Sequence, residues 1–438
     1  METTVLSTIT KTKLNRILWL SQQDRKIKFN NLMNIFNVES LRECFNALNG
    51  KKAVGIDGVK KEDYARDLEI NLQNLVKSIH EMGYRPNPVR EVLIPKEGKP
   101  GATRPLGISN FEDKIFQMMV QKTLDSIYEP LFLNCSYGFR PGKSCHDAIK
   151  DLSQYLYQNE IQTVIDIDLK NFFGTIDHGE LETLLNEKIS DKRFMRYINR
   201  MFKAGVLSDG DLRINDHGVP QGSLCSPILS NIFGHHVIDM WVEEMVKPNC
   251  KGKVALFRYA DDCVICCQYE GDALRIKTAL AKRLGKFKLE MNEEKTKLVR
   301  FNKTQARCGI KQETFDFLGF TFYWGNSRGG FIIPKLKTKA KAMKSKLNSM
   351  TKWFKEIRHE KKLKEIWKIF QAKLRGHVQY YGVSHNSASV QSFIFKSTKI
   401  AFKWINRRSQ RKSFSWEKFN LFINKHPLPK AHVAHSLF

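Results

Sequence analysis

Apolar positions along the chain divide it into a helical beginning, a strand-rich middle and a helical end. Residues 11–90 carry apolar side chains at mostly helical spacing and end at a Gly-Tyr-Arg-Pro-Asn-Pro turn signal. Two short strands are predicted next, at Val89–Pro95 and Leu106–Ile108, joined by a loop rich in glycine, lysine and proline. Helices are predicted again over 111–130 and 144–158.

The middle of the chain is dominated by strand patterns. The run TVIDIDL at 163–169 is apolar and β-branched, and 254–267 has the pattern of two buried strands around a tight turn. The run FDFLGFTFYW at 315–324 predicts one more aromatic strand with a glycine bend. Helical stretches at 180–203, 223–246 and 271–289 separate the strands, which predicts an α+β fold: a mixed sheet with helices on one face.

After Pro334 the pattern becomes helical. Apolar residues recur at steps of three and four from Leu336 to Ile357, which predicts one amphipathic helix. A second helix is indicated by Leu363, Ile366, Trp367, Phe370 and Leu374. The boundary before this region lies near residue 330, at Asn-Ser-Arg-Gly-Gly.

The charge of the chain is concentrated in this last region. The 438 residues carry a net charge of +28, and residues 331–438 contain 25 Lys and Arg against 4 Glu and no Asp, a net +21. A charge that served only solubility would have little reason to gather in one region. A region that grips nucleic acid would gather it, because each phosphate contact releases counterions and adds affinity. Some of the interleaved aromatic side chains could stack on bases.

Length and composition limit the remaining possibilities. A chain of 438 residues with 42% hydrophobic residues predicts two or three folded domains. It has no apolar run near the ~20 residues that span a bilayer and no signal-peptide order at its N-terminus, so we expect a cytoplasmic protein without a membrane partner. Cys263, Cys266 and Cys267 lie in an apolar run and are interpreted as buried strand thiols, with a zinc site as the weaker alternative.

The sequence Tyr-Ala-Asp-Asp at 259–262 is the sharpest chemical signal. Asp261 and Asp262 are adjacent carboxylates between two apolar strands, where their like charges repel and burial adds to the cost. A divalent cation removes this difficulty, and Mg²⁺ prefers such oxygen ligands. The alternative is an ordinary hairpin turn, in which aspartate is common.

Asp168, at the end of its own strand, offers a third carboxylate. Together the three predict a site for two Mg²⁺ ions ~3.5–4 Å apart, which would activate a primer 3′-hydroxyl and neutralise a triphosphate. We prefer Asp168 to Asp166, which we expect to point to the opposite face of the sheet. Asp177 is a weaker candidate and is interpreted as structural.

Nine segments carry recognisable motifs in a definite order. They are RPLGI (104–108), CSYGFRPGKSCHDAI (135–149), DIDLKNFF (166–173), VPQGSLCSPILSNI (219–232), RYADD (258–262), LEMNEEKTKLV (289–299), TFDFLGF (314–320), RGHVQYYGV (375–383) and NRRSQRKSFSWEKF (406–419). Together they resemble the ordered motifs of reverse transcriptases, specifically group II intron-encoded proteins of the bacterial, C-type-like kind that lack an endonuclease. The resemblance covers roughly Gly55 to the end of the chain.

This resemblance implies a right-hand polymerase. Residues 1–90 would form an N-terminal extension and the start of the fingers, and 91–330 the reverse transcriptase fingers and palm with the mixed sheet. Residues 331–438 would form the α-helical, basic thumb or maturase (X) domain. The implied reaction is RNA-templated addition of deoxynucleoside triphosphates to a DNA primer with two Mg²⁺ ions, and the implied second partner is the intron RNA.

Family roles follow for eight positions. Asp168, Asp261 and Asp262 match the metal-binding triad, and Phe173 matches an aromatic gate against the ribose 2′-hydroxyl. Arg104 and Lys96 match residues that hold the triphosphate, and Gln221 a residue near nucleotide and template. Lys295 matches a lysine that could protonate pyrophosphate, with an ordinary solvated lysine as the equal alternative. Core packing is the alternative for Phe172 and Phe173, and we expect one of them to serve it.

Two departures from the family pattern qualify these expectations. Gly174 stands where the family often has an aspartate, and no Cys/His-rich cluster precedes the final HSLF, so we expect no DNA cleavage.

One rival function is that of a maturase that only binds RNA to assist splicing, and another is that of a domesticated relative working in defence. The sequence predicts no oligomeric state.

Overall fold

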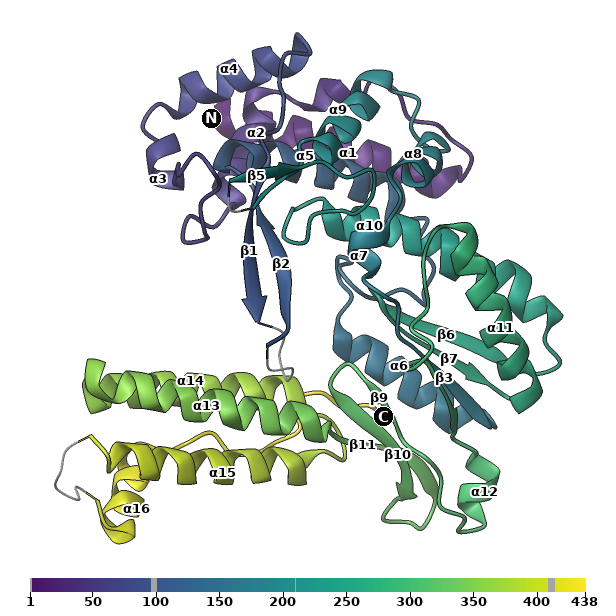
Figure 1. The fold of residues 1–438 in the computed structure, drawn as a ribbon, viewed down its shortest axis with the longest axis vertical. Helices are drawn as coiled ribbons and strands as arrows, with labels where there is room; N and C mark the ends of the chain where they lie inside the picture. The colour runs from purple at the N-terminus through teal and green to yellow at the C-terminus, as the bar shows by residue number, and fades with distance from the viewer. Residues whose placement is uncertain (1, 96–100, 209, 409–413) are drawn as a thin grey trace.

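A computed structural model describes residues 2–95, 101–208, 210–408 and 414–438. Its first part is a helical layer, as predicted (Figure 1). Helix α5 runs through the middle of this layer, and Ile115, Phe116, Met119 and Val120 on it are fully buried. The layer consists of α1 (Glu2–Gln23), the 3₁₀ turn η1 (Leu32–Ile35), α2 (Val38–Ala47), α3 (Lys61–Tyr64), α4 (Leu68–His80), α5 (Phe111–Tyr128), α8 (His178–Asn186) and α9 (Lys192–Lys203).

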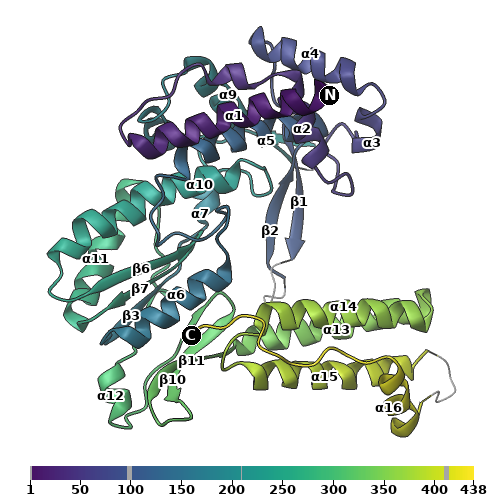
Figure 2. The same cartoon turned by 180° about the vertical axis from the view of Figure 1, so that it is seen from behind.

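A mixed four-stranded sheet projects from this layer. Its order is β2-β1-β4-β5, and β1 pairs with β4 in parallel while the other neighbours are antiparallel. Figures 1 and 2 both show the β1–β2 hairpin running from the helical layer toward α13 and α14. The predicted strand pair is confirmed, whereas the two short strands that extend it were not predicted. The strands are β1 (Val89–Pro95), β2 (Thr103–Ile108), β4 (Val206–Ser208) and β5 (Asp211–Arg213).

The central sheet has the order β6-β7-β3-β8 and is antiparallel throughout. Its strands are β3 (Thr163–Ile167), β6 (Val254–Tyr259), β7 (Asp262–Cys267) and β8 (Lys297–Arg300), and α6 (Cys145–Gln158) and α11 (Glu270–Lys286) cover it. Ile165 and Ile265 belong to the core that includes α11, whereas Val164 and Val264 belong to the core that includes α6. The prediction of a mixed sheet with helices on one face is therefore wrong for this sheet. Both of its faces are apolar, so both need cover.

Short elements join these layers. The helix predicted over 223–246 begins as α10 and continues with two π turns, and the predicted helix over 180–203 is two helices. The short elements are α7 (Phe172–Thr175), α10 (Ser226–Gly234), η2 (His235–Asp239), η3 (Val242–Val246), η4 (Lys247–Asn249) and α12 (Lys303–Arg307).

A third sheet, ordered β11-β10-β9, follows the central one along the chain. Its strands are β9 (Phe315–Phe317), β10 (Phe320–Asn326) and β11 (Ile332–Thr338). The single aromatic strand predicted at 315–324 is in fact a hairpin, because Leu318 (φ 48°) and Gly319 (φ 81°) take left-handed conformations that reverse the chain. Leu336, predicted as helical, is wholly buried in β11 opposite Phe322.

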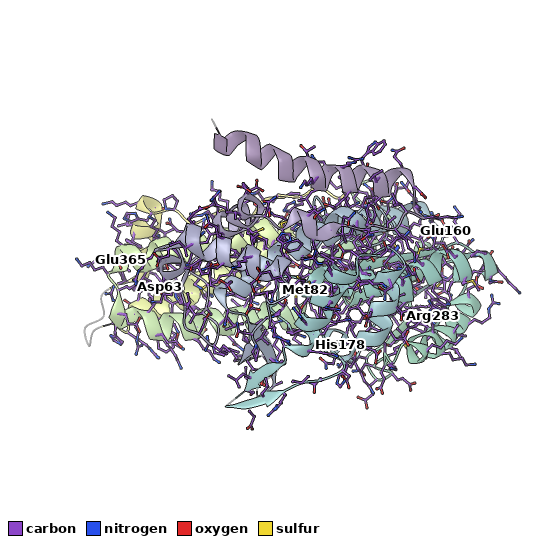
Figure 3. All side chains as sticks on the ribbon, turned by 90° about the horizontal axis from the view of Figure 1, so that it is seen from above. Asp63, Met82, Glu160, His178, Arg283 and Glu365 are labelled. Atoms are coloured by element: carbon purple, nitrogen blue, oxygen red, sulfur yellow. The ribbon has the colours of Figure 1, made fainter. Side chains whose placement is uncertain are left out.

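The last region is a bundle of long helices, as predicted (Figure 2). Met350, Phe354 and Ile357 form the buried stripe of α13. Seen from above, Glu365 of α14 lies at the same end of the molecule as Asp63, whereas Glu160 and Arg283 lie toward the other end (Figure 3). The helices are α13 (Ala340–Glu360), α14 (Leu363–Tyr381), α15 (Ser387–Ile405) and α16 (Trp416–Lys425).

The C-terminal segment ties this bundle to the central sheet. Val383 forms a β-bridge with His435, and Leu437 is 1% exposed. The side-chain amide of Gln154 in α6 donates to the Leu437 carbonyl at 3.2 Å. Within the described residues, none of the helices combines the length and apolar character that a membrane crossing requires.

Candidate active site

A cavity of about 1000 Å³ lies where the central sheet meets α7, β2 and the loop before α10. It brings together seven of the eight predicted site residues, and the eighth, Lys96, lies outside the described residues. The seven are Arg104, Asp168, Phe173, Gln221, Asp261, Asp262 and Lys295.

The turn between β6 and β7 carries two of the carboxylates. Tyr259 pairs with Asp262, which leaves Ala260 and Asp261 as the two turn residues. Ala260 has a φ of 57°, a region that favours glycine, so the surrounding structure must hold the turn in place. The tight turn predicted at Ala260–Asp262 is confirmed.

Arg258 is the principal support of this turn, and sequence reasoning assigned it no role. It is wholly buried, and its guanidinium donates to both carboxylate oxygens of Asp239 at 2.6 Å and to the Ala260 carbonyl at 3.2 Å. Although burial favours the neutral acid, the Arg258 charge holds the pKa of Asp239 below its usual value. The available signal was an arginine inside an apolar strand, because such a charge needs a buried partner.

Gly138 supports the turn from the other side. A Cβ atom at this position would lie 2.5 Å from the Ala260 amide nitrogen, so the backbones approach more closely than any other residue would permit. The Asn231 side-chain amide donates to the Gly138 carbonyl at 2.7 Å. The loop carrying Tyr-Gly-Phe-Arg therefore fixes the position of the Asp-Asp pair.

Asp168 approaches the same cavity from the end of β3. Its backbone carbonyl accepts from the Asn292 amide at 2.8 Å, and its own amide donates to the Thr296 hydroxyl at 3.2 Å. The Lys295 ammonium lies 3.3 Å from a carboxylate oxygen of Asp168, and both side chains are about half exposed. The segment that carries Lys295 is thus fixed to the strand that carries Asp168.

The carboxylates influence one another electrostatically. Asp261 and Asp262 are open to the cavity, yet the protein around them raises the pKa of both, and that of Asp262 reaches about 6. For Asp262 the desolvation acts first, followed by repulsion from Asp261, Asp166 and Asp168. Because these carboxylates repel one another, a bound cation would stabilise their charged forms.

The expectation that Asp166 points away from the site is wrong. Residues two apart along an extended strand point to the same face, and the charge of Asp166 contributes to the raised pKa of Asp262. Burial, then repulsion from Asp316, raises the pKa of Asp166 itself to about 6. Asp166 does not line the cavity, so Asp168 remains the better candidate of the two.

The three carboxylates share one cavity without forming a finished metal cage. In the part of the chain that the structure describes, no group of three His, Cys, Asp or Glu side chains is arranged closely enough to hold a metal ion unaided. This arrangement fits Mg²⁺, which usually takes one or two protein carboxylates and completes its shell with water and substrate phosphates.

Comparison with known proteins identifies the family. Residues 94–322 match the family model described as reverse transcriptase (RNA-dependent DNA polymerase). The chain belongs to the reverse transcriptase family.

Individual relatives agree with this assignment. Protein YkfC of Escherichia coli strain K12 is 33% identical over 312 residues, which cover 64% of this chain and 78% of that protein. The group II intron-encoded protein LtrA of Lactococcus lactis is 27% identical over 434 residues, covering 80% of this chain and 70% of LtrA. An uncharacterized 91 kDa protein in the cob intron of Schizosaccharomyces pombe is 30% identical over 266 residues, or 60% of this chain and 32% of that protein. The resemblance to group II intron-encoded reverse transcriptases is confirmed.

The two adjacent phenylalanines of this reverse transcriptase differ in placement, and the expectation that one of them packs in the core is confirmed. Phe172 is 2% exposed and belongs to the core, whereas Phe173 is half-buried and lines the cavity. Their rings meet edge to face with centroids 5.7 Å apart. At Gly174, a Cβ atom would lie 2.3 Å from the Asn171 side chain, so this pair of residues fits together where the family often has aspartate.

Arg104 and Gln221 reach the cavity of the reverse transcriptase from adjoining segments. Arg104 is exposed on β2, and the Gly107 amide of that strand donates to the Gln221 carbonyl at 2.6 Å. Gly222 has a φ of 107°, and a Cβ atom there would lie 2.5 Å from the Gly107 carbonyl. The Pro-Gln-Gly loop therefore sits directly against the β1–β2 hairpin.

Two further interpretations are confirmed. Asp177 is structural: its carboxylate caps α8 by accepting from the Glu180 amide at 3.0 Å and pairs with Lys288 at 2.7 Å. Cys263, Cys266 and Cys267 are buried thiols of β7.

Proposed function

We propose that this reverse transcriptase extends a DNA primer on an RNA template, using the cavity that Asp168, Asp261 and Asp262 share. The single observation that supports this most strongly is the meeting of these carboxylates with Arg104 and Phe173 in one cavity of about 1000 Å³. A hairpin turn without catalytic use would have no reason to face such a constellation.

Two Mg²⁺ ions fit this set of oxygen donors. Asp168, Asp261 and Asp262 would hold them, and their presence would relieve the repulsion that raises the pKa of Asp262 to about 6. When bound, such a pair stabilises the attacking and leaving oxygens of an in-line phosphoryl transfer.

The remaining cavity residues have separate tasks. Arg104 would bind the triphosphate through its fixed fork of N–H donors. Phe173 would occupy the space that a ribose 2′-hydroxyl needs, so the site would accept deoxynucleotides. Lys295, whose ammonium lies 3.3 Å from Asp168, would donate a proton to the departing pyrophosphate. Gln221, held against β2, would contact nucleotide and template.

The architecture supports a right-hand arrangement. The helical layer and the β1–β2 hairpin would be the fingers, with residues 1–90 as the extension, and the central sheet would be the palm. The bundle of α13, α14 and α15 faces the hairpin in both views and would be the thumb or maturase domain over 331–438 (Figures 1 and 2).

The second partner is the RNA of the intron. The net +21 of residues 331–438 gives the bundle the charge needed to hold folded RNA. We propose that this binding stabilises the intron's splicing-competent fold, in keeping with the intron-encoded relatives. The expected lack of DNA cleavage stays a prediction, as does the cytoplasmic location.

Primer extension tests the proposed reaction. The purified protein, poly(rA)/oligo(dT), deoxythymidine triphosphate and Mg²⁺ should yield extended DNA, and Asp261→Ala combined with Asp262→Ala should abolish it. Extension that is unchanged in the double variant, or absent from the wild type, would overturn the proposal.

The rival functions give different results. A maturase that only binds RNA would show no extension with the wild-type protein, although it carries all three carboxylates. A domesticated enzyme would extend primers, but the DNA that flanks its gene would lack ribozyme-like sequence.

A further inference from the structure

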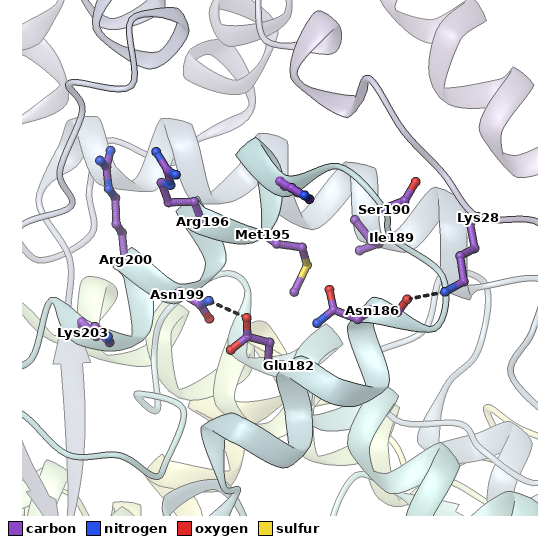
Figure 4. A pocket seen from close by; sticks show the side chains of 11 residues that line it. Lys28, Glu182, Asn186, Ile189, Ser190, Met195, Arg196, Asn199, Arg200 and Lys203 are labelled. Carbon is purple, nitrogen blue, oxygen red and sulfur yellow. Dashed lines mark hydrogen bonds between the residues drawn. The ribbon is translucent and has the colours of Figure 1, made fainter.

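A second hollow lies between α8 and α9 in the helical layer (Figure 4). Its volume is about 690 Å³, and none of its lining residues lines the catalytic cavity. Figure 4 shows Glu182 and Asn186 on the α8 side and Arg196 and Lys203 on the α9 side. We refer to this hollow as the α8–α9 groove.

The lining of the α8–α9 groove is strongly positive. It contains five cationic side chains and one carboxylate, Glu182, which accepts from the Asn199 amide at 2.8 Å. The cationic residues are Lys28, Lys192, Arg196, Arg200 and Lys203. Helix α9 carries no acidic residue at all, and residues 1–330 have a net charge of only +7, so this concentration is not a general property of the surface.

The fold brings one of these cations from a distant part of the sequence. The Phe29 amide donates to the Lys188 carbonyl at 2.7 Å, and the Ser190 amide donates to the Phe29 carbonyl at 2.8 Å. Phe29 and Ile189 are both buried at this junction. The pairing holds the segment with Lys28 beside the end of α8, where its ammonium donates to the Asn186 carbonyl at 3.1 Å.

Some of the cations stabilise the fold, whereas others have no such use. Arg200 donates to the carbonyls of Met82 and Tyr84 at 2.8 and 2.7 Å, which fastens α9 to the turn after α4. Lys192, Arg196 and Lys203 are exposed, and among the described residues they have no hydrogen-bond or ion-pair partner. They lie along α9 over about 16 Å of helix axis. A bound anion would relieve the mutual repulsion of these cations.

We infer that the α8–α9 groove binds the sugar–phosphate backbone of a folded RNA while primer and template occupy the catalytic cavity. The identification of the polyanion as RNA rests on the proposed function. A line of cations about 16 Å long neutralises several successive phosphates of a strand. The amides of Asn186 and Asn199 offer donors and acceptors for ribose hydroxyls. A hollow between two helices suits a rounded strand better than the plane of a membrane.

Replacing the three unpartnered cations tests this inference. The variant Lys192→Gln, Arg196→Gln and Lys203→Gln is compared with a control in which the exposed lysines Lys251, Lys282 and Lys286 become glutamine. The probe is a fluorescent stem-loop RNA, added to protein already saturated with a short primer–template and a non-reacting nucleotide. We expect the groove variant to bind the stem-loop at least about tenfold more weakly than the control, with a salt slope lower by about 2 to 3.

Primer extension on the short primer–template separates this inference from the proposed reaction. Extension by the groove variant should equal that of the control variant, which also shows that the variant is folded. Stem-loop binding by the groove variant that equals the control overturns the groove assignment and leaves the polymerase untouched. If the wild-type protein extends no primer while the groove variant still binds the stem-loop more weakly than the control variant, the groove assignment stands and the proposed polymerase reaction is overturned.

Discussion

At the scale of single residues, the site depends on side chains that look alike in sequence and differ in placement. Phe172 is core and Phe173 lines the cavity, although they are neighbours in a short helix. Asp166 lies in β3 and Asp168 directly follows this strand, but only Asp168 lines the cavity. Substitutions at two such neighbouring positions should therefore affect different properties, one the stability of the core and the other the chemistry of the cavity.

Phe173→Val should relax the choice of sugar. Removing the ring opens space for a 2′-hydroxyl, so incorporation of ribonucleotides relative to deoxynucleotides should rise on the order of 10- to 100-fold. Single-nucleotide addition with each substrate measures this ratio. Phe172→Val is the matched control: it should lower the thermal midpoint through a core cavity and leave the ratio unchanged. An unchanged ratio in Phe173→Val would remove the gate from the mechanism.

At the scale of secondary-structure elements, two other segments hold the catalytic turn and a third lines the cavity beside it. Arg258 reaches back to Asp239 after α10, Gly138 packs from the loop before α6, and Leu318 lines the cavity from the β9–β10 turn. The Tyr380 hydroxyl of α14 donates to the Leu318 carbonyl at 3.0 Å. The helical bundle is thus connected directly to the wall of the catalytic cavity.

Arg258→Met should destabilise the protein by about 3–5 kcal/mol, because it leaves the buried Asp239 carboxylate with only the His235 imidazole, 3.7 Å away, beside it. Urea unfolding measures the loss, and adding Asp239→Leu should recover part of it. Arg66→Met is the control, since its ion pair with Asp63 is solvent-exposed and should contribute less than about 1 kcal/mol. An equally small loss in Arg258→Met would contradict the supporting role of this residue.

Within the bundle, the buried His377 of α14 makes the folding stability of the protein depend on pH. It is 5% exposed, neither ring nitrogen has a hydrogen-bond partner among the described residues, and its ring stacks on Phe393 at 3.6 Å. Burial, then the nearby Lys346 charge, lowers the pKa of His377 to about 3. The unfolded chain binds a proton below about pH 6.5 while the folded chain stays neutral, so stability falls as the pH drops below that value.

His377→Phe should remove this dependence. The wild type should lose about 2 kcal/mol from this group between about pH 7 and pH 5, and the variant should not. Thermal midpoints of both proteins at the two pH values measure the difference. A variant that loses as much stability as the wild type on acidification would contradict the assignment.

At the scale of the whole molecule, local sequence patterns predicted most helices and strands, whereas almost none of the contacts between distant segments could be predicted. The strand at Val89–Pro95, the Asp-Asp hairpin and the helices of the bundle follow from periodicity and turn signals. Leu336 was misassigned because its spacing also suits a helix, and only the pairing with β10 makes it a strand residue. The cover on both faces of the central sheet and the support from Arg258 depend on segments far apart in the sequence. The α8–α9 groove depends on such contacts too.

The chemistry was easier to predict than the frame around it. Carboxylates in an apolar setting are costly wherever they occur, so Asp261 and Asp262 stand out without any structure. The family resemblance supplied Arg104, Phe173, Gln221 and Lys295, and the structure places all four in the cavity with the carboxylates. Their individual roles stay predictions.

Single-turnover addition of one deoxynucleotide by Asp168→Asn tests the shared carboxylate site most directly. The substitution keeps the size of the side chain and removes one negative charge, so the protein should bind primer–template nearly as well as the wild type. We expect the rate of addition to fall by about 10³-fold or more, since about 4 kcal/mol of transition-state stabilisation depends on that carboxylate. A rate within about tenfold of the wild type would show that Asp168 does not share in the chemistry at the primer end.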